Sequence, residues 1–349
     1  MRVRTHRSHP LAAGLAAIAL VATLGACSAD TCDDGDAEGG TLVIYSGRNE
    51  NLVGGVLDQL EDAVGMTVEV RYASSSELAA QLLEEGDASE ADLFFSQDAG
   101  ALGALAKADM LAPIEDDVLG LVPQEYRDAE GRWVATSARA RVLAYDPAAF
   151  PDLEAVSSID ALLDPEYRGE VGYAPTNASF HAFVTALRVE RGEDGARQWL
   201  EDFKANQPEA FENNNAVLDA VDSGQVGVGL INHYYWYQKV AELGEDAVSA
   251  RIHFLDSDDP GALVNVAGVG VLATSDDSDA AQRAVEFLLS AEAQQYFADE
   301  TAEYPVVEDV TSTVFDLEPL AELDAHQIDL NELDSLEETL ALLDEVGLT

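Results

Sequence analysis

An alternation of short apolar strands with amphipathic helices constrains the fold of this chain more than any other feature. The first predicted strands are Leu42–Tyr45, Val68–Tyr72 and Asp92–Phe95, and the predicted helices between them are Asn51–Val64 and Ser76–Glu85. The second helix is preceded by Ser74 with Glu77 three residues later, which is the pattern of a capping box. Strands that alternate with helices in this way indicate layered α/β architecture.

Later apolar segments predict a second unit built in the same way. Arg141–Tyr145, Val171–Ala174 and Val226–Ile231 are expected to be its strands, and the long, Gly-containing strand Val264–Ala273 would return the chain to the first unit. A globular part of about 320 residues exceeds a typical single domain, so we expect two.

The amino end of the chain has the pattern of an export signal. Three arginines within the first seven residues precede an apolar stretch, Leu11–Leu24, that is too short to be a stable membrane span. It ends in Leu24-Gly25-Ala26-Cys27, which resembles the bacterial lipoprotein box, so residues 1–26 are predicted to be a lipoprotein signal peptide and Cys27 the lipidated residue. The alternative is an ordinary signal peptide with a cysteine there by chance. Residues 27–40, rich in Asp, Gly and Ala, are expected to be a flexible tether, and Cys32 then has no disulfide partner.

The chain is strongly acidic. It has 67 Asp and Glu against 18 Lys and Arg, for a formal charge of −49 that becomes −52 once the three arginines of the signal are removed. This charge excludes nucleic acid as an attractive partner and favours a soluble monomer, because copies of the chain repel one another. It is also typical of adaptation to high salt. Because an acidic surface attracts cations unspecifically, the charge by itself does not predict a metal site.

A pair of tyrosines follows one of the predicted strands. The run Val226–Ile231 leads into Asn232-His233-Tyr234-Tyr235-Trp236-Tyr237, and ligands of open α/β folds bind at the carboxyl ends of strands. Two adjacent phenols there can point into one cleft, and ferric iron is the natural partner, since a trivalent ion can displace a phenol proton. The alternative is an aromatic cluster that packs at the start of a helix.

The chain resembles the periplasmic ferric-ion-binding proteins of ABC iron importers. The resemblance covers residues 41–349 and rests on four segments at predicted strand ends: Thr41–Arg48 (TLVIYSGR), Ala91–Asp98 (ADLFFSQD), Pro175–Phe180 (PTNASF) and Ile231–Trp236 (INHYYW). It implies a two-lobed periplasmic-binding-protein fold, type II-like, with the ligand between the lobes. Residues 41–138 with 262–349 would form lobe 1, and residues 139–261 lobe 2. The acidic carboxyl end is expected to wrap the first lobe as helices.

The same resemblance implies a function and a set of site residues. The protein would be no enzyme: it would bind Fe³⁺ outside the cytoplasm, anchored to the cell membrane, and deliver it to an ABC permease and its ATPase. Carried over position by position, Tyr234 and Tyr235 match the metal ligands. The matches for a synergistic anion, carbonate or phosphate, are Asn177, Ala178, Ser179, Asn214, Asn232 and Arg48. Arg139 is a further candidate, favoured over Arg141, which alternation on a strand would place on the same face.

The chain also departs from the family pattern. Asn49 stands where many members have a histidine ligand, Gln97 where they have a glutamate, and Phe180 where other subgroups have a third tyrosine. The resemblance therefore leaves two firm protein ligands, and the remaining sites would be filled by an anion and water, or by Glu50 or Asp98. Fe³⁺, two phenolates, a carbonate and one arginine, assigned to Arg48, would together be neutral, and a neutral cluster costs least to enclose.

Other assignments remain open at this stage. His233 and His181 match no ligand position and are predicted to be packing or supporting residues. A receptor for an oxyanion or an organic phosphate, with the tyrosines merely lining the cleft, is the main alternative function. An extracellular hydrolase is disfavoured, because no nucleophile–base pair stands out.

Overall fold

The structure is a computed structural model, and it describes residues 40–323 and 328–349. The predicted signal peptide, the lipidation site Cys27 and the tether apart from Gly40 lie outside the described residues.

The strands of the described residues form one sheet in the order β2-β1-β3-β10-β5-β8-β6-β7, with β4 paired to β10 and β9 paired to β5. Their bounds are β1 (Thr41–Ser46), β2 (Thr67–Tyr72), β3 (Leu93–Ser96), β4 (Leu111–Ala112), β5 (Val134–Tyr145), β6 (Val171–Tyr173), β7 (Glu209–Ala210), β8 (Val228–Asn232), β9 (Arg251–His253) and β10 (Val264–Leu272). We call the part around β1–β3 the first lobe and the part around β6–β8 the second lobe.

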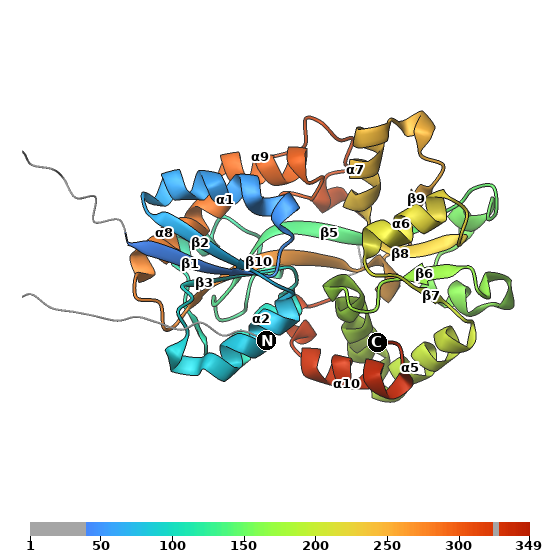
Figure 1. Ribbon diagram of the computed structural model, residues 1–349, viewed down its shortest axis with the longest axis horizontal. Helices are drawn as coiled ribbons and strands as arrows, with labels where there is room; N and C mark the ends of the chain where they lie inside the picture. The colour runs from blue at the N-terminus through green and yellow to red at the C-terminus, as the bar shows by residue number, and fades with distance from the viewer. Residues whose placement is uncertain (1–39, 324–327) are drawn as a thin grey trace, which may run out of the picture. The chain divides into compact units, whose positions relative to one another are not determined.

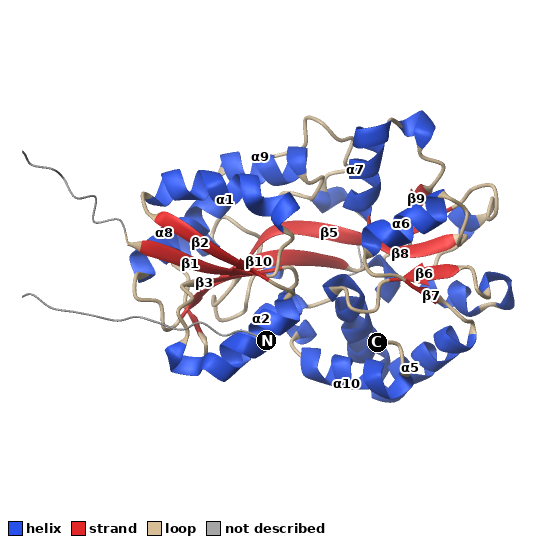
Figure 2. Ribbon diagram, in the orientation of Figure 1, coloured by secondary structure: helices blue, strands red, loops and turns tan. Residues whose placement is uncertain are grey.

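Helices cover both sides of these strands (Figure 2). The α-helices are α1 (Glu50–Val64), α2 (Ser75–Glu85), α3 (Ala99–Lys107), α4 (Asp116–Leu119), α5 (Ala178–Ala205), α6 (Asn214–Asp222), α7 (His233–Leu243), α8 (Ser278–Leu288), α9 (Ala291–Glu300) and α10 (Leu336–Val346), and the short 3₁₀-helix η9 spans Leu330–Leu333. In the view of Figure 1, α1 and α9 lie above the first lobe's strands and α2 below them. The helices α6 and α7 lie above the second lobe's strands, and α5 and α10 lie below.

Two long strands join the lobes. The first half of β5 pairs antiparallel with β10, and its second half pairs antiparallel with β8. Within each lobe the neighbouring pairs β1–β2, β1–β3 and β6–β8 are parallel. Every residue of β5 and β10 is buried, so the connection between the lobes is a structured crossing, visible as the two strands through the middle of Figure 1.

Most elements predicted from the sequence are confirmed. The strand predictions overlap β1, β2, β3, β6, β8 and β10, and the two early helices match α1 and α2 within one residue at each end. The capping box is also present, since the Ser74 side chain accepts from the Glu77 N–H and the Glu77 side chain accepts from the Ser74 N–H. One strand is longer than expected: β5 begins at Val134 and not at Arg141. The part before Arg141, residues 134–140 (VATSARA), lacks a continuous apolar pattern and is buried by tertiary contacts.

The carboxyl-terminal segment crosses from one lobe to the other. Leu330 and Leu333 of η9 belong to the first lobe's apolar core, whereas Leu342 and Leu343 of α10 belong to the second lobe's core. The expectation that this end wraps the first lobe is therefore wrong for α10, whose apolar face packs on α5. The lobe boundaries taken from the sequence otherwise stay a prediction.

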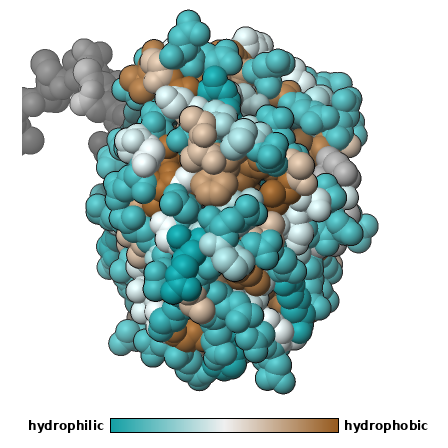
Figure 3. Space-filling model, turned by 90° about the vertical axis from the view of Figure 1, so that its right-hand side faces the viewer, coloured by the Kyte–Doolittle hydropathy of each residue, from teal (hydrophilic) through white to brown (hydrophobic). Residues whose placement is uncertain are grey.

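The surface agrees with the acidic composition. Hydrophilic residues cover most of the face in Figure 3, and hydrophobic residues interrupt them in separate places. In the part of the chain that the structure describes, no helix is both long and apolar enough to cross a membrane.

Candidate metal centre

The tyrosine pair lies where a buried strand passes directly into a helix. All five residues of β8 are buried, and its last residue, Asn232, precedes the first turn of α7. Asn232 has extended backbone angles, φ −97° and ψ 152°, which end the strand. Tyr234 and Tyr235 are therefore held on the first turn of α7, at the carboxyl end of β8, as the sequence predicts.

The two phenols lie side by side. Tyr234 is fully buried and Tyr235 half-buried, and their ring centroids are 4.2 Å apart at an angle of 34°. Burial raises the pKa of the Tyr234 phenol well above its usual value, and Tyr235 and Glu303 add to the effect, while Arg139 acts in the opposite direction. Without a cation, Tyr234 is a neutral phenol.

A cleft of about 300 Å³ opens above the tyrosines, and both lobes line it. Its lining residues are Gly47, Asn49, Asn51, Leu52, Ser74, Ser75, Gln97, Thr176, Asn177, Ala178, Asn213, Asn215, Tyr234, Tyr235 and Gln238. The described lining contains no carboxylate and no imidazole, although the chain has 67 acidic residues. The cleft is thus a neutral, amide-rich and hydroxyl-rich space with two phenols in its wall.

The predicted anion loop begins α5 beside this cleft. Asn177 is the N-cap, and its Oδ1 accepts from the Ser179 N–H at 2.9 Å and from the Ser179 hydroxyl at 2.7 Å. Asn214 Nδ2 donates to Ser179 Oγ at 3.1 Å, which ties α6 to the loop. Asn177 and Ala178 line the cleft, whereas Ser179 and Asn214 are buried behind it. The amino end of a helix favours anions through its free N–H groups and its dipole.

Arg48 has a partner that the sequence did not reveal. Its Nη1 and Nη2 donate to Glu303 Oε1 and Oε2 at 3.0 and 2.5 Å, and both side chains are fully buried. Burial by itself lowers the pKa of Arg48, but the Glu303 carboxylate outweighs it and the pKa is raised. An anion would have to share Arg48 with Glu303, so the anion-binding role of Arg48 stays a prediction.

Arg139 lies beside this ion pair without a hydrogen-bond partner among the described residues. Its Nη1 is 4.0 Å from Glu303 Oε1, and its side chain is 1% exposed. Burial lowers the pKa of Arg139. Asn232, another predicted anion contact, is buried as well, and neither of its side-chain polar atoms has a partner in the described part of the chain.

The other candidate ligands lie at different depths. Gln97 and Asn49 line the cleft, with Gln97 Nε2 3.5 Å from the Tyr234 hydroxyl, while the Asn49 side chain caps α1 by accepting from the Asn51 N–H. Glu50 is exposed in the first turn of α1 and is not in the lining. Asp98 is buried as the N-cap of α3, where its Oδ1 accepts from the Ala101 N–H at 3.0 Å.

His233, which was predicted to be a supporting residue, has backbone contacts, and Phe180, which stands at the position of the missing third tyrosine, has core contacts. His233 Nδ1 accepts from the Ala140 N–H at 3.3 Å, which leaves the proton on Nε2 to bond the Ala302 carbonyl at 2.9 Å. The ring of Phe180 packs against Tyr173 in the second lobe's core, with centroids 5.1 Å apart. It supplies no oxygen to the cleft.

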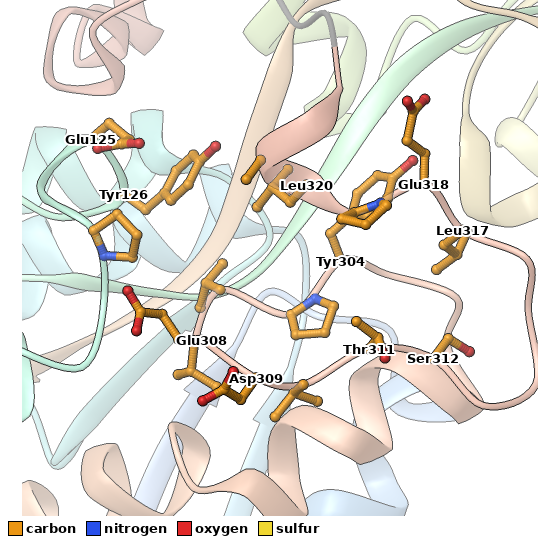
Figure 4. Close-up of a pocket in the computed structure, with 17 residues that line it drawn as sticks. Glu125, Tyr126, Tyr304, Glu308, Asp309, Thr311, Ser312, Leu317, Glu318 and Leu320 are labelled. Carbon is orange, nitrogen blue, oxygen red and sulfur yellow. The ribbon is translucent and has the colours of Figure 1, made fainter.

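No group of three or more His, Cys, Asp or Glu side chains in residues 40–323 and 328–349 is arranged to hold a metal ion. A metal in the cleft would therefore depend on the phenols and on ligands from outside the protein. A separate cavity of about 310 Å³, lined by Tyr126, Tyr304 and parts of 305–321, is mostly apolar with acidic residues at its edge (Figure 4). It does not include the tyrosine pair.

Sequence reasoning missed Glu303 and several residues of the lining. Glu303 is 255 positions from Arg48 along the chain, and one glutamate among many acidic residues has no distinguishing local pattern. Asn213 and Asn215 flank the predicted Asn214, so the cluster 213–215 of three asparagines was the available signal. Gln238 lies one turn after Tyr234 and Tyr235 on α7, a helical spacing that places it on the same side.

Comparisons with known proteins agree with this architecture. Residues 88–330 match the family model described as bacterial extracellular solute-binding protein. The chain is 35% identical over 308 residues to the Fe(3+)-binding periplasmic protein of Serratia marcescens, covering 88% of this chain and 90% of that one. It is 34% identical over 312 residues to the major ferric iron-binding protein of Neisseria meningitidis serogroup B, covering 88% and 93%.

A solved structure is similar over nearly its whole length. Iron-bound HitA from Pseudomonas aeruginosa superposes with a TM-score of 0.82 at 35% identity, covering 88% of this chain and 99% of that one. The two-lobed fold predicted from the sequence is confirmed by this match, and these relatives are solute-binding proteins and not enzymes. The chain belongs to the bacterial extracellular solute-binding protein family.

Proposed function

We propose that this protein binds Fe³⁺ in the cleft between its lobes, with Tyr234 and Tyr235 as phenolate ligands, and delivers it to the permease of an ABC importer. One observation carries the proposal: two phenols whose ring centroids are 4.2 Å apart lie in the wall of a cleft lined by both lobes. The names of the Serratia and Neisseria relatives, which specify ferric iron, support it.

The charge of the ion explains the choice of phenols. Because burial raises the pKa of Tyr234, only a cation that binds oxygen ligands strongly can displace the proton of its phenol. A trivalent ion meets this requirement better than the divalent ions that prefer carboxylates or imidazoles. The cleft offers neither of those groups.

An anion would complete the coordination of the iron. Asn49 and Gln97 are neutral, so they cannot offset the charge that remains after two phenolates bind. Carbonate or phosphate at the amino end of α5, next to Asn177 and Ala178, would supply both the charge and additional oxygen ligands. Water would fill the rest.

The working location follows from the amino-terminal segment. A lipid on Cys27 and a flexible tether would hold the protein at the outer side of the cell membrane, close to the permease and its ATPase. The strongly negative charge, −49 for the full chain and −52 without the signal, favours a monomer at that surface. Family membership supports the extracytoplasmic location.

Colour separates this function from the main alternative. Adding a ferric chelate such as ferric nitrilotriacetate, with bicarbonate, to the metal-free protein should produce a visible tyrosinate–iron band that saturates at one equivalent. A receptor for an oxyanion or an organic phosphate would stay colourless and would instead release heat when phosphate is added without metal. That second result would overturn the ferric proposal.

A further inference from the structure

One short turn lies behind the cleft and is bonded to both of its walls. The turn comprises Thr301–Glu303, between the end of α9 and Tyr304, whose side chain belongs to the first lobe's core. All three residues of the turn are buried, and Ala302 has a left-handed backbone with φ 57°. Because residues other than glycine rarely adopt this conformation and do so at a cost in free energy, the contacts around Ala302 must hold the turn in place.

The turn is bonded to the first lobe's wall of the cleft through Glu303. The Glu303 carboxylate accepts from both terminal nitrogens of Arg48, and the two chain neighbours of Arg48, Gly47 and Asn49, line the cleft. Glu303 also accepts from the Ser137 hydroxyl on β5 at 3.1 Å. The loop that lines this wall is therefore fixed to the turn by a buried, two-point ion pair.

The turn is bonded to the second lobe's wall through two of its carbonyl groups. Gln238 Nε2 donates to the Thr301 carbonyl at 2.8 Å, and His233 Nε2 donates to the Ala302 carbonyl at 2.9 Å. Both donors lie on α7, one directly before the tyrosine pair and the other one turn after it. Since α7 packs on an apolar cluster of the second lobe, these two bonds join a second-lobe helix to a first-lobe turn.

We infer that the turn Thr301–Glu303 is a clamp that holds the two walls at the spacing in which iron is bound, and that His233 and Gln238 are positioning residues through which it slows iron release. The inference rests on the proposed function. Because the turn is short and buried, the walls cannot move apart without breaking its bonds to Arg48 or its bonds to α7. Release of the iron then requires this break, so each bond adds to the barrier for opening.

The two ends of the clamp act in series. Once the bonds at one end are broken, the turn no longer connects the walls, and breaking the other end adds little. A side chain that touched the iron or its anion directly would instead act independently of Glu303. Gln238 is in the lining of the cleft and His233 is behind it, so a shared effect of the two cannot come from contact with the ion.

The experiment measures the rate at which the visible band of the ferric complex decays after excess EDTA is added at pH 7.5. Gln238→Met and His233→Phe remove the two donors on α7 but keep much of each side chain's volume. Glu303→Asp keeps the carboxylate but shortens its side chain by one methylene, which weakens the other end. Gln295→Met is the matched control, because this amide on α9 donates to the Thr311 carbonyl at 3.0 Å, outside the clamp.

We expect iron release to be on the order of tenfold faster in Gln238→Met and in His233→Phe, which is the effect of one hydrogen bond on a rate. Gln295→Met should keep the parent's rate. Glu303→Asp should also release iron faster, and the double variant Gln238→Met/Glu303→Asp should be about as fast as the faster of its two single variants. Circular dichroism verifies that each variant is folded. Since Gln238 is half-buried, Gln238→Met carries the test if His233→Phe does not fold.

A folded Gln238→Met protein that releases iron at the parent's rate would overturn the inference and leave ferric binding intact. A double variant in which the two accelerations multiply would overturn it as well, because independent contributions to a barrier add. A parent protein that develops no visible band with ferric nitrilotriacetate and bicarbonate would instead overturn the proposed function.

Discussion

The buried imidazole of His233 should make the metal-free protein less stable in mild acid. Its two ring nitrogens are used by the Ala140 N–H and the Ala302 carbonyl, and protonation of Nδ1 would remove the first of these bonds. Burial lowers the pKa of His233 from 6.5 to about 4. The unfolded chain therefore binds this proton at a higher pH than the folded one, and stability is lost as pH falls below 6.5.

The size of the decrease in the free energy of unfolding follows from the linkage between proton binding and folding. With a folded pKa near 4 and an unfolded pKa of 6.5, this one group reduces the free energy of unfolding by about 2 kcal/mol between pH 7 and pH 5. The reduction reaches about 3 kcal/mol at pH 4.

Urea denaturation of the parent and of His233→Gln, at pH 7 and pH 5 and constant ionic strength, measures this contribution. The variant is expected to be less stable at pH 7 but to lose about 2 kcal/mol less than the parent on acidification, since the carboxylates titrate alike in both. Equal losses in the two proteins would refute the reasoning. Nitrogen NMR offers an independent check, because His233 should remain the neutral Nε2–H tautomer above pH 5.

Three further predictions concern iron release and two buried arginines. Because the raised pKa of Tyr234 favours the protonated phenol, acid should bleach the ferric band at a higher pH than it abolishes the far-ultraviolet circular dichroism; coincident loss would mean that unfolding releases the iron. Arg48→Met leaves the buried Glu303 carboxylate without its main partner, so the free energy of unfolding measured in urea should fall by about 3 kcal/mol. Glu303→Gln should lower this free energy much less in the Arg48→Met background than in the parent protein. Arg188→Met removes the guanidinium that bonds α10 through Ser335 and Thr339, and should cost about 2 kcal/mol with faster hydrogen exchange in α10; unchanged exchange there would contradict this assignment.

Local patterns were sufficient for most of the regular elements. The capping box at Ser74 and the apolar spacing of α1 are short-range properties, so the sequence alone predicts them. The first half of β5 is different: it is buried through pairing with β10 and through contacts of Arg139 and its neighbours with distant residues. A strand of that kind has no local apolar signal.

The residues of the candidate site also differ in whether the sequence alone predicts them. Tyr234 and Tyr235 were predictable because they directly follow a buried strand, where the end of the strand and the start of a helix fix their position. The ion pair between Arg48 and Glu303 was not predictable, since it depends on how the segment after α9 returns to the crossing strands. Which arginine bonds the Glu303 carboxylate with both terminal nitrogens is therefore a property of the tertiary structure.

The most direct test of the account is the visible absorption of the ferric complex in three matched variants. Tyr234→Phe, Tyr235→Phe and Tyr237→Phe each remove one hydroxyl from the first turns of α7, but only the first two residues line the cleft. With one equivalent of ferric nitrilotriacetate and bicarbonate, we predict that Tyr237→Phe keeps the parent's band and affinity. Tyr234→Phe and Tyr235→Phe should lose most of both while keeping the parent's circular dichroism. A parent-like band and affinity in both cleft variants would contradict the assignment of the tyrosine pair as the ferric ligands.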